Sequence, residues 1–458
     1  MIRRLFLGAA ALVLMSLSLQ AQNTDTLRYH VSLKDKVGSA YSLSKPEKFL
    51  SQRALDRRAR QNIKVDSTDL PVSEAYVKQI EKLGVKVVVK GKWENFVTVS
   101  TNDPLMAERI KTFDFVKEVH KVWQKPSGET PASEAKRDSL VNKQVYHPDS
   151  LYGASTAQIQ ISNAQKLHEA GFKGQNMIIG IIDAGFHNAD RMDALNNVRI
   201  LGYKDLTGQN TDVFAESSHG LAVLSCIGAN KPGYIVGTAP EASFYLLRSE
   251  DSYSEQPIEE DYWCAAAEYA DSVGVDVVNT SLGYNAFDDP ADNYELRHLD
   301  GKTILMSRQA ARFASKGMVL VCSAGNSGRD SWKKVTTPGD ADHVLTVGAI
   351  DSTGLLATFS SIGTSADGRI KPDVVAVGVA SSVLNTRGNQ SRGNGTSFAS
   401  PIMCGMVACL WQACPSLSVD ELLDLIRMSG DRADYPDNIY GYGVPDMWKA
   451  YQTYKQAH

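Results

Sequence analysis

The sequence predicts an α/β protein in which a parallel β-sheet carries helices on both faces, in three layers, and is preceded by a small α+β domain. Five apolar runs of strand length lack the alternation of a strand with one wet face, and they lie at 177–183, 242–248, 275–281, 317–323 and 343–350. Residues 259–272 and 303–315, between successive runs, suit helices. This alternation is typical of parallel strands joined by right-handed crossovers.

The N-terminal part of the chain has a different pattern. Strands are expected at 27–33, 85–90, 95–101 and 116–123, and helices at 46–60, 73–83 and 103–113. We therefore predict a small α+β domain over residues 22–125. The Pro-, Ser- and Gly-containing stretch that follows is typical of a linker, so we assign residues 126–150 to a linker and 151–458 to the main domain.

Residues 1–21 have the composition of a secretory signal peptide. Arg3 and Arg4 precede an apolar stretch from Leu5 to Leu19, and the small residue Ala21 marks the expected cleavage site. The stretch is shorter than the roughly 20 residues that a membrane span requires. Because no second long apolar run follows, we expect an exported chain, secreted or periplasmic, without a membrane span in its mature form.

The composition, with 43% hydrophobic and 22% charged residues, is that of a globular protein with a large core. The formal net charge of −4 hides an asymmetry, because residues 1–21 carry +2, residues 22–125 carry +7 and residues 126–458 carry −13. Opposite charges favour docking of the two domains. The basic residues are interspersed with acidic ones and show no aromatic stacking pattern, so we predict no nucleic-acid partner.

Six cysteines in an exported chain allow disulfides. Most of them lie in apolar stretches, where cysteine commonly acts as a small buried hydrophobe. Cys404, Cys409 and Cys414 recur at five-residue steps along one helical stretch, so they do not face one another. We expect mostly free, buried thiols, and the sequence leaves room for one disulfide.

The run Gly395-Thr396-Ser397-Phe398-Ala399-Ser400-Pro401-Ile402 places a serine in a glycine-led turn at the start of an apolar helical stretch. Such a turn exposes the hydroxyl, and the free N–H groups at the helix start favour a developing anion. Pro401 is expected in the first helical turn, where its missing N–H costs little. The alternative is an ordinary helix cap at Gly-Thr-Ser.

Three further polar side chains lie where they can serve this serine. Asp183 ends an apolar strand, His219 opens an apolar helix, and Asn326 follows another apolar strand. Catalytic groups collect at the carboxyl ends of parallel strands, so we expect all of them at one edge of the sheet. A base, a group that orients the base and a donor to the oxyanion are what a nucleophilic serine requires.

Five segments, in order, carry a family resemblance: Asp183-Ala184-Gly185, Ser218-His219-Gly220, Ser281-Leu282-Gly283, Ala324-Gly325-Asn326 and Gly395 to Pro401. Over residues 175–452 the sequence resembles the subtilisin-type serine proteases (subtilases, S8-like), in which Asp, His and Ser follow in this order. The resemblance implies the subtilisin-like three-layer fold. It also implies that residues 22–125 form an N-terminal prodomain.

The resemblance implies a secreted serine endopeptidase that works through an acyl-enzyme and is made as a self-processing zymogen. Ser397 would be the nucleophile, His219 the general base and then acid, and Asp183 the group that orients the imidazole. Asn326 and the backbone N–H of Ser397 would form the oxyanion hole.

Ser281, Leu282 and Gly283 resemble the stretch that pairs with an extended peptide, so polypeptides are the expected substrates. The prodomain would act as an intramolecular inhibitor, with self-cleavage between residues 124 and 150. This chemistry requires no cofactor, and the sequence indicates no metal site. The sequence does not decide whether calcium binds elsewhere. We expect a monomer.

Other residues and other functions are weaker candidates. His187 is expected in a solvated loop, His168 on the surface, and Glu250 in a solvated turn after a strand. Asp190 and Asp193 lack the spacing of a calcium loop. A non-catalytic binding protein would not need all four polar groups. An esterase of the α/β-hydrolase type would need the motif Gly-x-Ser-x-Gly and the chain order Ser, acid, His, and the sequence has neither.

Overall fold

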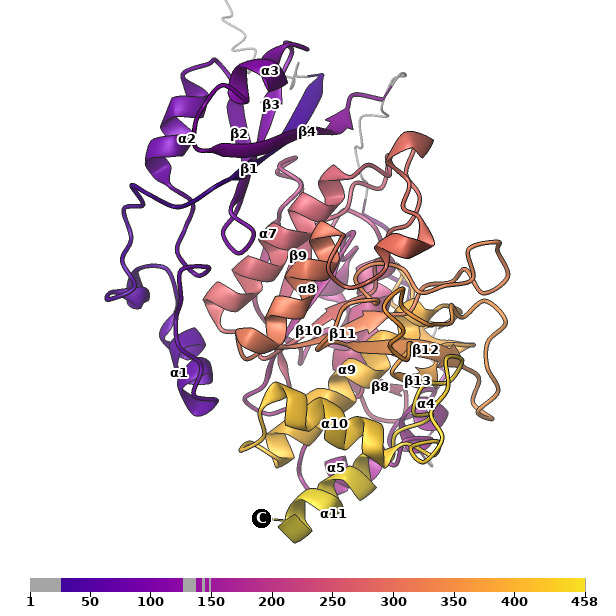
Figure 1. Cartoon of the computed structure of the whole chain (residues 1–458). Coiled ribbons are helices and arrows are strands. Elements are labelled where there is room, and N and C mark those ends of the chain that lie inside the picture. Colours follow the sequence, from indigo (N-terminus) through magenta and orange to yellow (C-terminus); the bar gives the residue numbers. More distant parts are fainter. Residues whose placement is uncertain (1–25, 127–136, 142–144, 148–149, 458) are drawn as a thin grey trace, which may run out of the picture.

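The structure, a computed structural model, describes residues 26–126, 137–141, 145–147 and 150–457. The predicted signal peptide and part of the predicted linker lie outside the described residues. Figure 1 shows a smaller N-terminal domain seated on a larger α/β domain. No helix of the described residues is long and apolar enough to cross a membrane.

The larger domain is built on a seven-stranded sheet in the order β13-β12-β11-β10-β5-β9-β6. Every neighbouring pair in this sheet is parallel. The strands are β5 (Ile178–Asp183), β6 (Arg199–Asp205), β9 (Ser243–Arg248), β10 (Val277–Thr280), β11 (Val319–Ser323), β12 (Leu345–Ile350) and β13 (Val374–Val377). The predicted fold class is therefore confirmed.

Helices cover both faces of the sheet. Alternate residues of β5 divide between them, because Ile179 and Ile181 pack in the core beneath α6 and α9, whereas Ile178 and Ile182 pack beneath α7 and α8. This two-sided burial explains why the central strands are apolar without alternation. The helices of this domain are α4 (Thr156–Gln160), α5 (Ala164–Glu169), α6 (His219–Gly228), α7 (Ile258–Val273), α8 (Leu305–Ser315), α9 (Thr396–Ala413), α10 (Val419–Ser429) and α11 (Met447–Ala457).

All five predicted strands of this sheet are present, but two others were not predicted. Strand β6 lies at the edge, and its residues alternate between exposed and half-buried, so it lacks a long apolar run. Strand β13 has only four residues. Two small hairpins, β7 (Asn230–Lys231) with β8 (Ile235–Val236) and β14 (Ser381–Leu384) with β15 (Gln390–Gly393), complete the domain together with short 3₁₀ turns.

The N-terminal domain is a four-stranded antiparallel sheet in the order β2-β3-β1-β4. Its strands are β1 (Leu27–Leu33), β2 (Lys86–Gly91), β3 (Phe96–Thr101) and β4 (Val116–Gln124), and its helices are α1 (Gln52–Arg60), α2 (Glu74–Glu81) and α3 (Met106–Ile110). The predicted helix over 46–60 is divided. A 3₁₀ turn covers Pro46–Lys48, and α1 begins after Ser51, whose side chain accepts from the Ala54 N–H.

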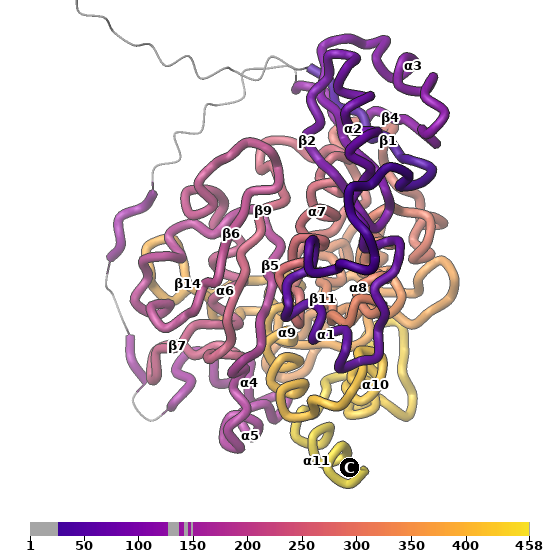
Figure 2. The backbone as a smooth tube through the Cα atoms, turned by 90° about the vertical axis from the view of Figure 1, so that its left-hand side faces the viewer, coloured from indigo at the N-terminus to yellow at the C-terminus, as the bar shows by residue number. Residues whose placement is uncertain are grey.

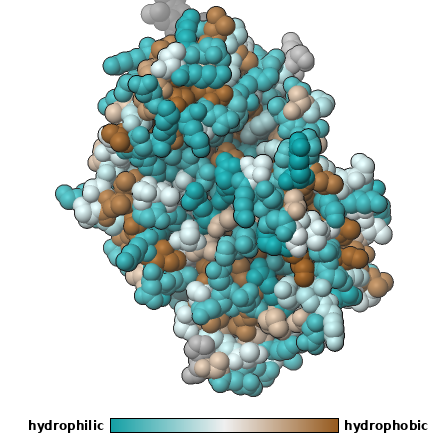
Figure 3. Space-filling view, viewed as in Figure 1, coloured by the Kyte–Doolittle hydropathy of each residue, from teal (hydrophilic) through white to brown (hydrophobic). Residues whose placement is uncertain are grey.

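The N-terminal sheet packs on the face of the larger domain that carries α7 and α8. Val89, Phe96 and Val122 of the sheet share a core with residues of both helices. Figure 2 shows the domain and its α1 segment running along this side of the molecule. The face in Figure 3 is mostly hydrophilic, with hydrophobic side chains in scattered patches.

All six cysteines are buried and free, so the possible disulfide is absent from the structure. Burial in apolar surroundings raises the pKa of each thiol. Such thiols are inert as nucleophiles, because only the thiolate is reactive.

Candidate active site

Asp183 is the last residue of β5, at the carboxyl end of the central part of the sheet. Its side chain is fully buried. One carboxylate oxygen accepts a hydrogen bond from the Ala184 N–H at 2.8 Å. The strand end therefore fixes the position of a carboxylate that water does not reach.

His219 is the first residue of α6, and its imidazole faces Asp183. The Nδ1 atom lies 2.9 and 3.0 Å from the two carboxylate oxygens of Asp183. Gly220 allows this approach, because a Cβ atom there would lie 2.4 Å from the Gly185 carbonyl oxygen. The start of α6 thus packs directly over the end of β5.

The surroundings of His219 favour its charged form. Burial by itself would lower the pKa of the imidazole, but the Asp183 carboxylate, with a further contribution from Glu250, raises this pKa to about 9. The side chain of His219 is 33% exposed, so its other face reaches the cleft. An imidazole held by a buried carboxylate on Nδ1 presents Nε2 to that cleft.

Ser397 is the second residue of α9, immediately after the Gly395-led turn. Gly395 adopts a φ of +154°, a backbone conformation that L side chains rarely take. The Ser397 hydroxyl donates to the Ser281 carbonyl at 3.3 Å. Among the described residues no hydrogen bond joins Ser397 to His219, so a rotation of the Ser397 side chain must precede any proton transfer between them.

Pro401 lies deeper in α9 than the sequence suggested. The helix starts at Thr396, so Pro401 is its sixth residue and falls beyond the first turn. A proline at this position has no N–H for the carbonyl four residues earlier, which is that of Ser397. The Ser281 hydroxyl donates to this carbonyl at 2.9 Å and replaces the missing helical bond.

Asn326 follows β11 and reaches the start of α9. Its Oδ1 atom accepts from the Thr396 N–H at 2.9 Å and from the Thr396 hydroxyl at 3.0 Å. Because two donors fix the oxygen, the orientation of the amide is determined, and Nδ2 has no protein partner among the described residues. Gly325 precedes it with a φ of +102°. Asn326 therefore offers an N–H donor beside Ser397.

A cleft of about 280 Å³ collects the predicted residues. His219, Ser281, Leu282, Gly283, Asn326 and Ser397 line it, and Asp183 lies beneath His219. These residues come from the ends of β5, β10 and β11 and from the starts of α6 and α9. The structure thus brings every predicted site residue to one place.

The cleft also contains residues outside the predicted site: Glu250, Asn285, Ser323, Gly325, Ser327 and Thr336. Glu250 is the main correction, because it lines the cleft instead of a solvated turn. The Tyr284 hydroxyl donates to it at 3.2 Å. Burial, together with the nearby carboxylates of Asp183 and Glu255, raises the pKa of Glu250 to about 8.

Asn279 supports the site and was not singled out in the sequence. It is a fully buried polar side chain in β10. Its Nδ2 donates to the Ser281 hydroxyl at 3.0 Å, and its Oδ1 accepts from the Ser400 hydroxyl at 2.8 Å. Asn279 therefore ties Ser281 and α9 together, and an isolated buried asparagine in a predicted strand was the available signal.

Two histidines expected at the surface are buried. His187 is 9% exposed, and its Nε2 accepts from the backbone N–H of Asp138 at 3.0 Å, because residues 137–141 lie over it. His168 is 4% exposed and contacts the Tyr152 hydroxyl and the Thr238 carbonyl, both at 3.0 Å. Neither lines the cleft.

The two aspartates of the loop after Asp183 form ion pairs. Asp190 pairs with Arg137, and Asp193 pairs with Lys231. In the part of the chain that the structure describes, no group of three or more His, Cys, Asp or Glu side chains could hold a metal ion.

Arg248 supports the site from below. Its guanidinium is fully buried and donates to the Ala184 carbonyl at 3.1 Å, directly after Asp183. It also donates to Asp205 and to the hydroxyls of Thr207 and Thr211 at 2.9–3.2 Å. One cation thus fixes the end of β5 and the loop that follows β6.

A parallel α/β fold that carries a hydroxyl, an imidazole and a carboxylate at one edge of its sheet defines a hydrolase of the serine type. Residues 174–443 match the Subtilase family, peptidase S8. Residues 28–138 match the peptidase S8 propeptide domain of Bacteroidota.

Similar proteins span most of the larger domain. Serine protease AprX from Bacillus subtilis strain 168 is 29% identical over 326 residues, which cover 65% of this chain and 70% of AprX. Subtilisin DY from Bacillus licheniformis is 32% identical over 301 residues, which cover 64% of this chain and 97% of that protein. Subtilisin NAT from Bacillus subtilis subsp. natto is 28% identical over 284 residues, 61% of this chain and 66% of the relative.

The chain belongs to the subtilase family of serine endopeptidases and carries an N-terminal propeptide domain. The resemblance noted in the sequence is confirmed. We refer to the two parts below as the propeptide domain and the catalytic domain.

Proposed function

We propose that this chain is an exported serine endopeptidase, made as a self-processing zymogen, in which Asp183, His219 and Ser397 form the catalytic triad. The observation that carries the proposal is the placement of His219. Its Nδ1 lies 2.9 Å from the buried Asp183 carboxylate, and it shares one cleft with Ser397 and Asn326.

The reaction begins when the Ser397 hydroxyl turns from the Ser281 carbonyl towards His219. His219 takes the hydroxyl proton as the oxygen attacks the scissile carbonyl carbon, and the resulting imidazolium is stabilised by Asp183. His219 then returns the proton to the leaving amine, which leaves an acyl-enzyme on Ser397. Water, activated by the same histidine, hydrolyses this ester and regenerates the hydroxyl.

Asn326 and the backbone N–H of Ser397 stabilise the oxyanion of the tetrahedral intermediate. The Asn326 Nδ2 atom is suited to this role, because its amide oxygen is already bound by Thr396 and its N–H bonds are unused by the described residues. A donor that is fixed before the reaction costs no reorganisation when charge develops.

Ser281, Leu282 and Gly283 bind the backbone of an extended polypeptide substrate beside the triad. They line the cleft at the end of β10. A Cβ atom at Gly283 would lie 2.2 Å from the Thr336 hydroxyl oxygen, so only glycine keeps this wall of the cleft close-packed. The chemistry needs no cofactor, and the enzyme acts as a monomer.

The propeptide domain acts as an intramolecular inhibitor of the enzyme. Where β4 ends, the Gln256 side chain accepts from the Gln124 N–H at 2.8 Å and donates to the Gln124 carbonyl at 3.0 Å. This pairing holds the end of the propeptide domain on the segment that joins Glu250 to α7. Arg137 and Asp138 also contact the catalytic domain, and we place the first cut between residues 124 and 150.

The proposal is tested by comparing the wild-type full chain with Ser397→Ala on a denaturing gel, alongside labelling by a serine-directed fluorophosphonate. The wild type should yield a propeptide fragment and a labelled larger fragment, whose N-terminal sequence locates the cut. Ser397→Ala should remain uncut and unlabelled. A wild-type chain that stays full length and unlabelled after export would disprove the proposal.

A further inference from the structure

The propeptide domain touches the catalytic domain along the whole length of α7. Its sheet covers the middle of α7, and the end of β4 bonds to Gln256 just before that helix. A second segment, residues 46–69 including α1, leaves the sheet and reaches the far end of α7, as Figure 1 shows; we call it the arm. Because α7 has 16 residues, its two ends lie about 24 Å apart, so the end of β4 and the arm are far from each other.

The arm covers a surface made by the carboxyl ends of α7 and α8, which we call the socket. It comprises Asp271 in the last turn of α7, Gly274, Val275 and Asp276 after α7, and Lys316 and Gly317 after α8. Helix carboxyl ends present free carbonyl groups and partial negative charge, and cations are favoured there. The socket therefore suits a basic partner.

Arg57 and Arg58 of α1 are the deepest contacts of the arm. Their side chains are 0% and 1% exposed. Arg57 donates to a carboxylate oxygen of Asp271 at 2.5 Å, and Arg58 donates to the other at 3.0 Å. Lys92 approaches the same carboxylate at 3.2 Å. Three cations of the propeptide domain thus surround one fully buried carboxylate of the catalytic domain.

Backbone carbonyls of the socket bind the same arginines. Arg57 donates to the Lys316 carbonyl at 3.2 Å and to the Val275 carbonyl. Arg53 donates to the Gly274 carbonyl at 2.9 Å. These contacts need the planar, multiple donors of a guanidinium, which a lysine ammonium does not provide.

The charge pattern is reciprocal, which fixes how the arm lies. Lys316 of the catalytic domain is 1% exposed, and its ammonium lies 3.2 Å from Asp69 and 3.4 Å from Asp66 of the arm. The Thr68 hydroxyl accepts from it at 2.7 Å. A basic helix alone would not match this part of the socket, so the surface selects the whole arm.

Shape also matches at the two glycines that end the helices. Gly274 and Gly317 have φ of +89° and +78°. A Cβ atom at Gly274 would lie 2.8 Å from Arg53, and one at Gly317 would lie 2.7 Å from the Gln61 side chain. The arm therefore packs directly against both helix ends.

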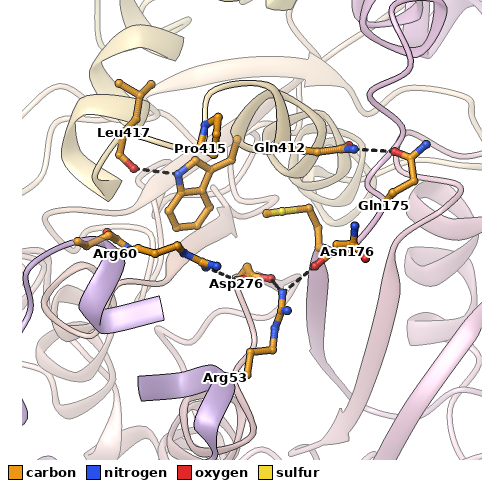
Figure 4. A pocket seen from close by; sticks show the side chains of 11 residues that line it. Arg53, Arg60, Gln175, Asn176, Asp276, Gln412, Pro415 and Leu417 are labelled. Atoms are coloured by element: carbon orange, nitrogen blue, oxygen red, sulfur yellow. Dashed lines mark hydrogen bonds and ion pairs between the residues drawn. The ribbon is translucent and has the colours of Figure 1, made fainter. Parts of the chain in front are cut away.

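The contact is open on one side. Figure 4 shows Arg53 and Arg60 of α1 converging on Asp276 at the edge of a cavity of about 270 Å³, whose other walls include Gln175, Trp411 and Gln412. Arg53 is 34% exposed and Arg60 is 57% exposed. The arm thus offers both buried and exposed arginines for comparison.

We propose that the arm is a second anchor, independent of the cleft, by which the socket retains the propeptide domain on the catalytic domain after the connecting chain has been cut. The partner that the socket fits is this chain's own propeptide domain, recognised through arginines of α1. Two linked contacts raise the effective concentration of each other, so losing either one speeds dissociation. The inference depends on the proposed function only in taking self-cleavage as the natural cut.

The test uses the full chain with Ser397→Ala and a recognition sequence for a site-specific protease inserted after Pro126. After cutting, the release of the propeptide fragment is followed over time by size-exclusion chromatography. The Arg57→Gln/Arg58→Gln variant should release the fragment at least about 30-fold faster, because truncating a buried charge pair acts mainly on dissociation. Arg60→Gln, on the same helix but exposed, is the matched control and should stay within about twofold of the parent.

If the double variant does not yield folded protein, Arg53→Gln decides the question. Its guanidinium is partly exposed but pairs with the buried Asp276, and release about fivefold or more faster than that of Arg60→Gln would support the anchor. Unchanged release in Arg53→Gln, or in a folded double variant, would overturn it. Because the added protease makes the cut, a failure of self-cleavage would be seen separately on the gel of the wild type.

Discussion

Ser281 and Ser397 are joined by two hydrogen bonds that run in opposite directions. The Ser281 hydroxyl donates to the Ser397 carbonyl at 2.9 Å, and the Ser397 hydroxyl donates to the Ser281 carbonyl at 3.3 Å. The first bond exists because Pro401 cannot supply the helical N–H. A residue of the proposed substrate-binding stretch thus positions the backbone of the proposed nucleophile.

Replacing Ser281 by Ala should lower kcat by about 2- to 10-fold with a small change in KM for a peptide substrate. The variant removes one hydrogen bond of about 0.5–1.5 kcal/mol and leaves the Ser397 carbonyl without its donor. Steady-state kinetics on a chromogenic peptide measure the effect. Ser416→Ala, an exposed serine far from the cleft, serves as the control, and equal kinetics of the two variants would contradict the positioning role.

Asn326 allows a test that separates catalysis from structure. Asn326→Ala should lower kcat by about 10²- to 10³-fold, the range known for the oxyanion asparagine of subtilisin. Asn326→Asp keeps an acceptor for the two Thr396 donors but loses the Nδ2 donor, so it should fold normally and be similarly impaired. Full activity in the folded Asp variant would exclude Asn326 from the oxyanion hole.

Glu250 should influence the pH dependence of the reaction. The pKa of His219 is raised to about 9, so activity, which needs the neutral imidazole, should rise with pH as the imidazolium loses its proton. Glu250→Gln removes one negative charge that favours the imidazolium, and the rise should move to lower pH.

The midpoint of this rise is the pH at which kcat/KM reaches half of its plateau. It is measured with the mature enzyme between pH 6 and pH 10, at about 0.1 M salt. Glu295→Gln, which alters an exposed carboxylate outside the cleft, should leave the midpoint in place. A Glu250→Gln profile that coincides with the parent profile would show that Glu250 does not act on His219.

Arg248 should matter for stability more than any surface arginine. Arg248→Leu leaves the buried Asp205 carboxylate without its cation and the Ala184 carbonyl without its donor. The free energy of unfolding should therefore fall by about 3–5 kcal/mol. Thermal or urea unfolding in a Ser397→Ala background avoids self-digestion during the measurement. Arg297→Leu, at a site where the side chain is 72% exposed, should change the unfolding midpoint little, and a similar small change in Arg248→Leu would refute the buried role.

Much of the fold could be predicted, because its central strands carry a local signal. Ile178 to Ile182 are apolar on both sides, and the structure divides them between two cores. Strand β6 escaped prediction because an edge strand with half-exposed residues resembles a loop in sequence. The predicted position of Pro401 in the first turn of α9 was also wrong, because the residue at which the helix starts depends on how the Gly395 turn packs.

The sequence predicted which residues form the candidate site, but not which contacts join them. Asp183, His219, Asn326 and Ser397 each stand beside a strand end or helix start, which the sequence marks. Glu250 was assigned to a solvated turn because nothing local distinguishes it from one. Its place in the cleft depends on Tyr284, 34 positions away, and on the loop that precedes α7.

The sequence by itself determined which chemical groups are present and at which ends of the elements they stand, because side-chain periodicity and turn residues are local properties. Only the tertiary structure decided how Ser281 meets Ser397, 116 positions away, and how Arg57 reaches Asp271, 214 positions away. Such pairs depend on which strands lie side by side and which helix ends are covered. Burial then makes these contacts strong, because the buried groups have no water molecules as alternative hydrogen-bond partners.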